Sequence, residues 1–218
     1  MGTITRSFAN NITTSGVLLP ASLNNNSISN VTSYNASVAT GNMVLISSQT
    51  ASASASISFT TGIDSTYKEY QFWFINMHPA TNDVRLVFNG STDGGSNYNV
   101  TKTTTAFYAL HTENDVSTSL TYQTGLDLAQ STDFQAVTNS IGNDNDQSAC
   151  AVLTLFNPSS TTYVKHFTIV ADTCDESDTQ INHYFAGYFN TTSAINAVQF
   201  KMFSGNIDDG TILMYGIK

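Results

Sequence analysis

The chain has 218 residues, 40% hydrophobic and 11% aromatic, which is enough for one large domain with a core of its own. Its formal net charge is -9 and its seven basic residues are scattered singly, so the sequence offers no patch for a run of phosphates and we expect no nucleic-acid binding. No stretch approaches the roughly 20 apolar residues of a membrane span, and the start has no continuous apolar region of a signal peptide, so we expect no membrane insertion and synthesis in a cytoplasm.

Residues 1–42 differ from the rest of the chain, because they are rich in Asn, Ser and Thr and poor in aromatic residues. Such a stretch seldom buries enough apolar surface to fold alone. Two interpretations stay open: a floppy terminus, or an extended N-terminal arm that becomes ordered on a neighbouring subunit or a larger assembly. The arm would dock through its apolar side chains. These candidate assembly contacts are Phe8, Val17, Leu18 and Leu19.

Strand patterns follow one another from Met43, where we expect the folded domain, residues 43–218, to begin. Residues 51–59 alternate strictly between Ser and apolar residues, which predicts one small-residue face and one hydroxyl face. Residues 70–77 are nearly continuous in apolar residues, which predicts a central strand covered on both faces. Further strands are expected at residues 43–49, 83–88 and 99–110.

Residues 111–146 are the least regular part, and we expect a long excursion with short helices near 126–130 and 133–140. Excursions of this length in compact domains often carry contacts or function. Strand patterns resume at 149–156, 163–171 and 183–189.

The last stretch, residues 195–218, reads as two alternating strands joined by polar turns. We expect a hairpin here, with Ser204-Gly205-Asn206 and Asp208-Asp209-Gly210 reversing the chain. Roughly eight to ten short strands with turn residues between them predict an all-β fold. We expect a two-sheet antiparallel β-sandwich of jelly-roll type.

No motif for nucleophilic catalysis or zinc binding stands out, because the four histidines are dispersed and no Gly-x-Ser-x-Gly is present. We therefore assign no catalytic or cofactor-binding residue. The paired carboxylates at residues 144–146, 172–178 and 208–209 are typical of turns, where Asp bonds its own backbone. Two alternatives remain. Calcium would use Asp172, Asp175 and Asp178. A polysaccharide-cleaving enzyme, the weakest hypothesis, would use Asp144, Asp146, Asp172 and Asp175.

Tyr184 and Tyr188 share one face of a predicted strand, while Phe185 and Phe189 share the other. One face must be core, and the outward one would be a glycan platform or a subunit interface. Cys150 lies in an apolar run and is expected to be buried. Whether it is bonded to Cys174 stays open.

Three segments resemble structural proteins of tailed phages, particularly marine ones. They are residues 88–100 (FNGSTDGGSNYNV), 156–167 (FNPSSTTYVKHF) and, most strongly, 187–218 (GYFNTTSAINAVQFKMFSGNIDDGTILMYGIK). In that family a jelly-roll-like sandwich ends in a strand, a Ser-Gly-Asn turn, a Gly-Thr-Ile and a final Tyr-Gly-Ile. The resemblance covers much of residues 43–218. It implies a capsid decoration protein, a head or tail fibre or a receptor-binding module, usually trimeric.

The first hypothesis is a non-enzymatic virion structural protein, displayed on the particle surface as a homo-oligomer, and anchored to capsid or tail proteins through residues 1–42. It would be made in the host cytoplasm without a signal peptide. The alternative is a glycan-binding adhesin of a tail fibre that recognises the host surface. We expect no cofactor, with calcium as the one exception kept open.

Overall fold

The computed structural model describes residues 42–218, which form strands connected by turns and loops with no helix among them. Residues 42–218 therefore contain no helix that is long and apolar enough to cross a membrane. Tertiary contacts divide the chain into residues 1–41 and residues 42–218. The strands are β1 (Met43–Thr50), β2 (Ile57–Phe59), β3 (Glu69–Pro79), β4 (Leu86–Ser91), β5 (Lys102–Thr112), β6 (Thr118–Tyr122), β7 (Gln135–Ala136), β8 (Ala149–Phe156), β9 (Lys165–Cys174), β10 (Thr179–Phe189), β11 (Ala197–Met202) and β12 (Ile207–Ile217).

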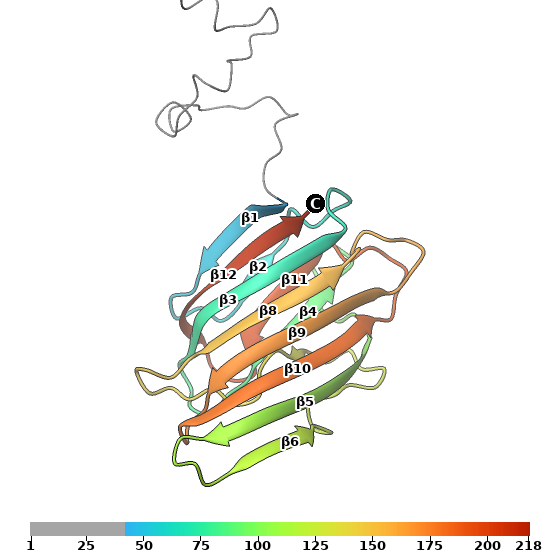
Figure 1. Ribbon diagram of the computed structural model, residues 1–218. Helices are drawn as coiled ribbons and strands as arrows, with labels where there is room; N and C mark the ends of the chain where they lie inside the picture. The colour runs from blue at the N-terminus through green and yellow to red at the C-terminus, as the bar shows by residue number, and fades with distance from the viewer. Residues whose placement is uncertain (1–41) are drawn as a thin grey trace, which may run out of the picture. The chain divides into compact units, whose positions relative to one another are not determined.

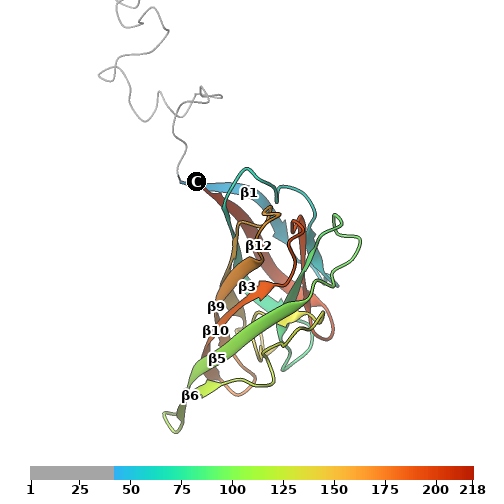
Figure 2. The same cartoon turned by 90° about the vertical axis from the view of Figure 1, so that its right-hand side faces the viewer.

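The strands are divided between two antiparallel sheets (Figure 1). The larger sheet has eight strands in the order β1-β12-β3-β8-β9-β10-β5-β6, and the smaller has four in the order β2-β11-β4-β7. A view rotated by 90° shows the two sheets as separate layers (Figure 2). The predicted all-β, two-sheet antiparallel β-sandwich is confirmed.

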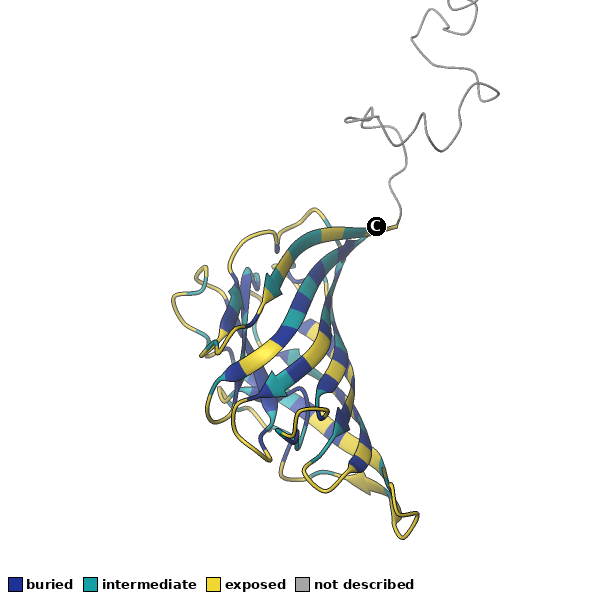
Figure 3. Cartoon of the chain, turned by 90° about the vertical axis from the view of Figure 1, so that its left-hand side faces the viewer, coloured by how far each residue is buried: buried dark blue, intermediate teal, exposed yellow. Residues whose placement is uncertain are grey.

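Side chains alternate between the core and the outer surface along the strands. Figure 3 shows this as bands of buried and exposed residues along the larger sheet, as expected when one face of a sheet packs and the other does not. In β9 every second residue from Lys165 to Thr173 is buried. The core therefore lies between the two sheets.

Phenylalanines from both sheets meet in this core. The ring of Phe200 on β11 lies 4.9 Å from that of Phe74 and 5.3 Å from that of Phe72, both on β3 of the other sheet. On its own sheet Phe200 meets Phe59 of β2 at 6.1 Å. All four side chains are buried, and burying each stabilises the fold by about 1.5–3 kcal/mol. This cluster joins the two layers.

The expected terminal hairpin is wrong, because β11 and β12 belong to different sheets. β11 pairs with β2 and β4, whereas β12 pairs with β1 and β3. The turn at residues 203–206 carries the chain across the core instead of reversing it within one sheet. Alternating apolar residues indicate only that each strand has a buried face, and both strands bury that face in the same core.

The acidic residues of this stretch do not form the second turn that we expected. Asp208 and Asp209 lie inside β12, where the register to β3 shifts on both sides of Asp209. Gly210 has φ +123°, and a Cβ there would come within 2.8 Å of the Asn76 carbonyl oxygen. The glycine therefore serves a bulge where two backbones approach closely.

Two other expectations need correction. Within residues 51–59 only Ile57–Phe59 forms a strand, because Ala53 adopts a left-handed φ of 49° that interrupts extended pairing. Residues 126–130 and 133–140 are not helical; the second range contains the two-residue strand β7. These segments instead bond to neighbouring strands, such as Thr104 N donating to Leu128 O at 2.9 Å.

The apolar run at residues 70–77 does form a central strand, β3, but only one of its faces is fully covered. Tyr70, Phe72 and Phe74 are buried in the core, whereas Trp73 is half-buried and Ile75 is exposed on the other side. The outer face of the larger sheet therefore carries large apolar side chains without a second layer over them in residues 42–218.

Candidate functional site

Seven large side chains form a continuous row across the outer face of the larger sheet. Each lies directly opposite the next in the strand register. We call this set the outer row. Its members, from β12 to β6, are Leu213, Trp73, Val152, Val170, Tyr184, Phe107 and Tyr122. Directly opposite residues on one face of a sheet are close enough to pack.

The outer row is accessible although its side chains contact one another. The rings of Phe107 and Tyr184 stack with centroids 5.0 Å apart, yet each side chain is about two-fifths exposed. Val170, at the middle of the sheet, is 46% exposed. Isolated exposed apolar residues need no explanation, but a contiguous set marks an interaction surface.

The face around the outer row is nearly free of charge. Of the outward positions on β3, β8, β9 and β10, only Glu69 and Asp172 carry an acid and none carries a lysine or arginine. Two shallow hollows flank the row. One lies at Cys150 and the other beside Tyr188. In a chain of net charge -9, a face without charge allows two copies to approach without strong repulsion.

Both edges of the larger sheet are uncharged as well. The edge strand β6 has the sequence TSLTY, with Leu120 75% exposed, and the opposite edge strand β1 has MVLISSQT, with Leu45 exposed. Natural proteins usually protect such edges with lysine or proline. Neither strand has this protection, so both edges can take part in association.

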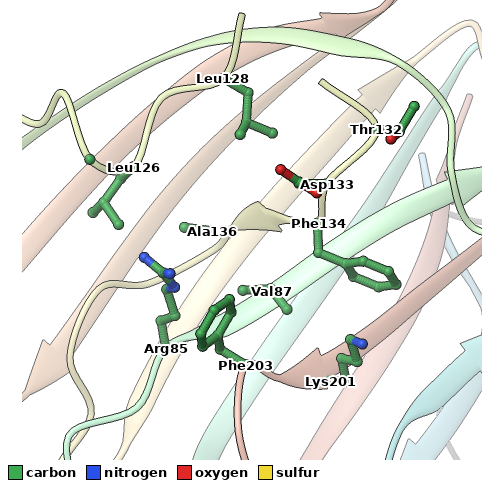
Figure 4. Close-up of a pocket in the computed structure, with 11 residues that line it drawn as sticks. Arg85, Val87, Leu126, Leu128, Thr132, Asp133, Phe134, Ala136, Lys201 and Phe203 are labelled. Atoms are coloured by element: carbon green, nitrogen blue, oxygen red, sulfur yellow. The ribbon is translucent and has the colours of Figure 1, made fainter. Parts of the chain in front are cut away.

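A second candidate site is a pocket on the outer side of the smaller sheet, beside the irregular segment 123–134 (Figure 4). We call it the Arg85 pocket. Its cavity volume is about 490 Å³, within the range of roughly 300–1,000 Å³ that ligand pockets have. Its lining residues are Arg85, Val87, Gly125, Leu126, Leu128, Thr132, Asp133, Phe134, Ala136, Lys201 and Phe203.

Two cations of the Arg85 pocket lie over aromatic rings. The Arg85 guanidinium carbon is 4.1 Å from the centroid of Phe203, and the Lys201 Nζ is 4.3 Å from that of Phe134. Neither cation is within ion-pair distance of a carboxylate in residues 42–218, where the only such contacts involve histidines. These cation–π contacts hold the guanidinium and the ammonium group in place and leave their N–H donors available.

Buried polar side chains hold the wall of the Arg85 pocket. Leu128 N donates to Thr104 Oγ1 at 2.8 Å, and Thr104 Oγ1 donates to Gln135 Oε1 at 2.6 Å. Gln135 Nε2 in turn donates to Leu126 O at 3.1 Å. Because Thr104 and Gln135 are buried, this chain of bonds fixes residues 126–128 against the sheets.

A second buried group supports the rim at Thr132. Lys102 Nζ donates to Asn89 Oδ1 at 2.9 Å, and Asn89 Nδ2 donates to Thr132 O at 2.9 Å. Burial lowers the pKa of Lys102 to about 7, and the charge of Asp133 acts in the opposite direction. The excursion expected at residues 111–146 thus supplies one wall of a pocket with a fixed shape.

The acids considered for catalysis are not gathered in one site. Asp146 lines a polar hollow with Asp208, Asp209 and His78, whose Nδ1 lies 3.8 Å from Asp208 Oδ2. Asp172 lies on the outer face of β9, away from that lining. Asp144 contributes its backbone carbonyl oxygen to His78.

The calcium candidates Asp172, Asp175 and Asp178 already have local partners. Asp175 Oδ1 accepts from Ser177 N and Thr179 N, both at 2.9 Å, as expected of an aspartate that makes a turn. Asp172 accepts from Gln180, and Asp178 accepts from Gln147. Between residues 42 and 218 no group of three or more His, Cys, Asp or Glu side chains is placed to hold a metal ion.

Tyr184 and Tyr188 both lie on the outer side of β10, and Phe185 and Phe189 are buried on the inner side, so one face of this strand is core as predicted. Tyr184 belongs to the outer row, and the ring of Tyr188 lies 5.9 Å from that of His166. The expected assembly contacts Phe8, Val17, Leu18 and Leu19 lie outside the described residues.

Cys150 is not buried, contrary to expectation. It lies on the exposed side of β8, opposite Asp172, because the apolar run around it has one inward and one outward face. Cys174 is half-buried at the end of β9. Both thiols are free.

Sequence reasoning found only Tyr184 of the outer row and missed the Arg85 pocket. The row depends on register between strands far apart in the sequence, and the pocket joins residues from β4, β11 and the segment 123–134. The isolated cations Arg85 and Lys201, each close in sequence to an apolar strand, were the only local signal. Comparison of the chain with protein-family models, curated proteins and solved structures found no match.

Proposed function

We propose that the two sheets are a jelly roll enlarged by two insertions. In a jelly roll of eight strands, one sheet pairs the first, eighth, third and sixth strands, and the other pairs the second, seventh, fourth and fifth. Leaving out β5, β6, β9 and β10, the remaining strands have this order, as β1-β12-β3-β8 and β2-β11-β4-β7. The two inserted pairs extend the first sheet beyond β8.

Capsid proteins, lectins and enzymes all use jelly rolls, so this fold alone does not determine the function, and the surfaces of the protein have to indicate it. We propose that the protein is a non-enzymatic structural component of a bacteriophage particle, displayed at its surface as a homo-oligomer. The outer row carries this proposal, because an apolar row across seven strands with almost no charge around it suits a contact between copies. The sequence resemblance to tailed-phage structural proteins supports the location on a virion.

The homo-oligomer is proposed to be a trimer, with the outer faces of the larger sheets meeting between subunits. The hollows beside Cys150 and Tyr188 would receive side chains of the neighbouring subunit. Sedimentation equilibrium of the full chain tests this stoichiometry. A mass of three times 23.5 kDa at micromolar concentration supports the trimer, and a mass of one chain at all concentrations contradicts self-association.

Residues 1–42 are proposed to anchor the protein to capsid or tail proteins, with Phe8 and Val17 to Leu19 as contacts. The test is incorporation of tagged full-length and residue 2–42-deleted protein into particles during infection of a host. The full chain should purify with the particles and the truncated chain should remain folded but free. Equal incorporation of both would refute the anchor. Cryo-electron microscopy of the particles would give the location.

A glycan-binding adhesin is the second candidate function. It is favoured by the stacked pair Tyr184 and Phe107, which presents aromatic surface to solvent on a rigid strand pair. A glycan array separates the two functions. Glycan binding that is lost in Tyr184→Ala would support the adhesin. A trimer that binds no glycan would indicate that this surface serves only in assembly.

A further inference from the structure

We propose that the Arg85 pocket binds an acidic saccharide, with the sugar carboxylate held between Arg85 and Lys201. This goes beyond the structural role on the particle, because the pocket lies on the outer side of the smaller sheet and the outer row lies on the larger one. Four features of the pocket indicate this ligand: two cations that have no carboxylate partner in residues 42–218, an exposed aromatic ring, a carboxylate that can accept from sugar hydroxyls, and a wall of fixed shape.

The cations have hydrogen-bonding capacity that residues 42–218 do not use. The Arg85 guanidinium lies over the ring of Phe203, and the Lys201 ammonium lies over the ring of Phe134. Guanidinium and ammonium groups favour carboxylates, since a charge-assisted hydrogen bond is roughly twice as strong as a neutral one. The described chain brings two cations to one hollow and gives neither a carboxylate partner, which indicates an anionic ligand.

The rest of the lining distinguishes a sugar from a small inorganic anion. Val87, Leu126 and Ala136 are buried and give an apolar floor, and the ring of Phe203 is 63% exposed at the rim. A phosphate or sulfate ion has no apolar surface to place there. The C–H face of a sugar ring does, and it can lie against an aromatic ring while its substituents reach polar groups.

Asp133 completes the recognition set. Its carboxylate lines the pocket opposite the two cations (Figure 4), and sugar hydroxyls can donate to it. The local charge is +2 from Arg85 and Lys201 and -1 from Asp133, which gives +1. This balance matches a ligand with one carboxylate and disfavours a phosphate dianion, which Asp133 repels.

The pocket is formed before any ligand arrives. The buried bonds through Thr104 and Gln135 hold residues 126–128, and the bond from Asn89 holds the carbonyl oxygen at Thr132. A preformed wall reduces the conformational cost of binding, which matters for a weakly held sugar. The overall charge of -9 opposes an anion at long range, so affinity depends on the local cations.

The test is isothermal titration calorimetry of the full chain at low salt with a trisaccharide of one glucuronic acid and two xylose units, which carries a single carboxylate. Maltotriose is the neutral control, and inorganic phosphate and 3-phenylpropionate are the anion controls. The acidic trisaccharide should bind at least about tenfold more tightly than any of the three. Absence of binding, or equal binding of phosphate or phenylpropionate, would overturn the proposal of an acidic saccharide.

Variants assign the binding to this pocket. Arg85→Gln and Phe203→Ala should each weaken trisaccharide binding by about tenfold or more. The first removes a positive charge that would pair with the sugar carboxylate, and the second removes the ring against which the sugar would stack.

Lys68→Gln is the matched control. It removes one exposed positive charge outside the pocket lining and should leave the affinity within about twofold. Asp133→Asn should strengthen phosphate binding more than trisaccharide binding, because both anions lose a repelling charge but only the trisaccharide also loses a charged acceptor for its hydroxyls. If Arg85→Gln and Lys68→Gln behave alike, the site is elsewhere.

Discussion

His183 is a buried histidine with an incomplete set of hydrogen bonds. It is fully buried on β10, and its Nε2 lies 3.2 Å from Thr173 Oγ1. Its Nδ1 has no hydrogen-bond partner within residues 42–218. Burial lowers the pKa of His183 to about 4. The folded protein therefore keeps this ring neutral at a pH where the unfolded chain, with an ordinary histidine pKa, has taken up a proton.

This difference in pKa predicts that the free energy of unfolding falls in acid. The substitution His183→Phe should remove the part of that loss that His183 causes. Between pH 6.5 and pH 4 the unfolded state binds the extra proton, so the free energy of unfolding falls by about 3 kcal/mol from this group alone. Urea unfolding at pH 7 and pH 4 should show a loss smaller by about that amount in His183→Phe. His111→Gln, at an exposed position, is the control and should lose as much as the wild type. Equal losses in all three proteins would exclude His183 as the cause.

Lys102 predicts the opposite dependence at high pH. Its folded pKa of about 7 is below the ordinary lysine value, so the cost of burying its charge is fully present below pH 7 and is relieved as pH rises toward 10. The contribution is on the order of 5 kcal/mol. Stability should rise from pH 7 to pH 9.5 in the wild type, and this rise should be much smaller in Lys102→Met.

The matched variant for Lys102 is Lys201→Met, which removes a lysine from the outer side of the smaller sheet. Its urea midpoint should rise with pH as in the wild type. Burial also lowers the pKa of Lys165, so Lys102→Met should keep a remaining rise in the same direction. A wild-type midpoint that stays flat from pH 7 to pH 9.5 would contradict a neutral buried Lys102.

Individual residues were predictable only in part. Alternation placed Phe185 and Phe189 in the core, because side chains on a strand change face at every step. It placed Cys150 wrongly, since an apolar run does not say which of its members face outward. Buried Lys102 was not predictable, because its two acceptors, Asn89 and Val100, are brought to it by the fold.

At the scale of elements, β11 connects the two layers through one side chain. Phe200 contacts phenylalanines of β2, β3 and β4. Phe200→Ala should therefore lower the free energy of unfolding by about 3–5 kcal/mol, since it leaves a cavity between the sheets. Phe203→Ala, just after the same strand, removes an exposed ring and should cost less than about 1 kcal/mol. Similar losses in urea unfolding would show that Phe200 does not join the layers.

Strand existence was easier to predict than strand pairing. Residues 149–156 were expected as a strand and form β8 with the same bounds, because their alternation lies between clear breaks. The pairing of β11 and β12 was wrong, since neighbouring strands in sequence usually pair and the local pattern cannot reveal a crossing between sheets. For the same reason the outer row, which needs the register of seven strands, could not be predicted.

At the scale of the whole molecule, the two sheets present different surfaces. The larger sheet offers an apolar, nearly uncharged face with open edges. The smaller sheet offers a pocket with two cations that have no carboxylate partner in the described part of the chain. This division fits a protein that assembles with copies of itself through one face and keeps the other for a ligand. Polar substitutions in the outer row should then leave the folded monomer stable but prevent its association.

The most direct test is the mass of Val170→Asp in solution. Val170 lies at the centre of the outer row and is 46% exposed, so the substitution should leave the fold intact while placing a charge in the contact between copies. Thr92→Asp, on the exposed connection after β4, makes the same change in net charge away from the row. In sedimentation equilibrium we expect wild type and Thr92→Asp to be oligomers and Val170→Asp to have the 23.5 kDa mass of one chain. An oligomer of unchanged mass in folded Val170→Asp would contradict assembly through this face.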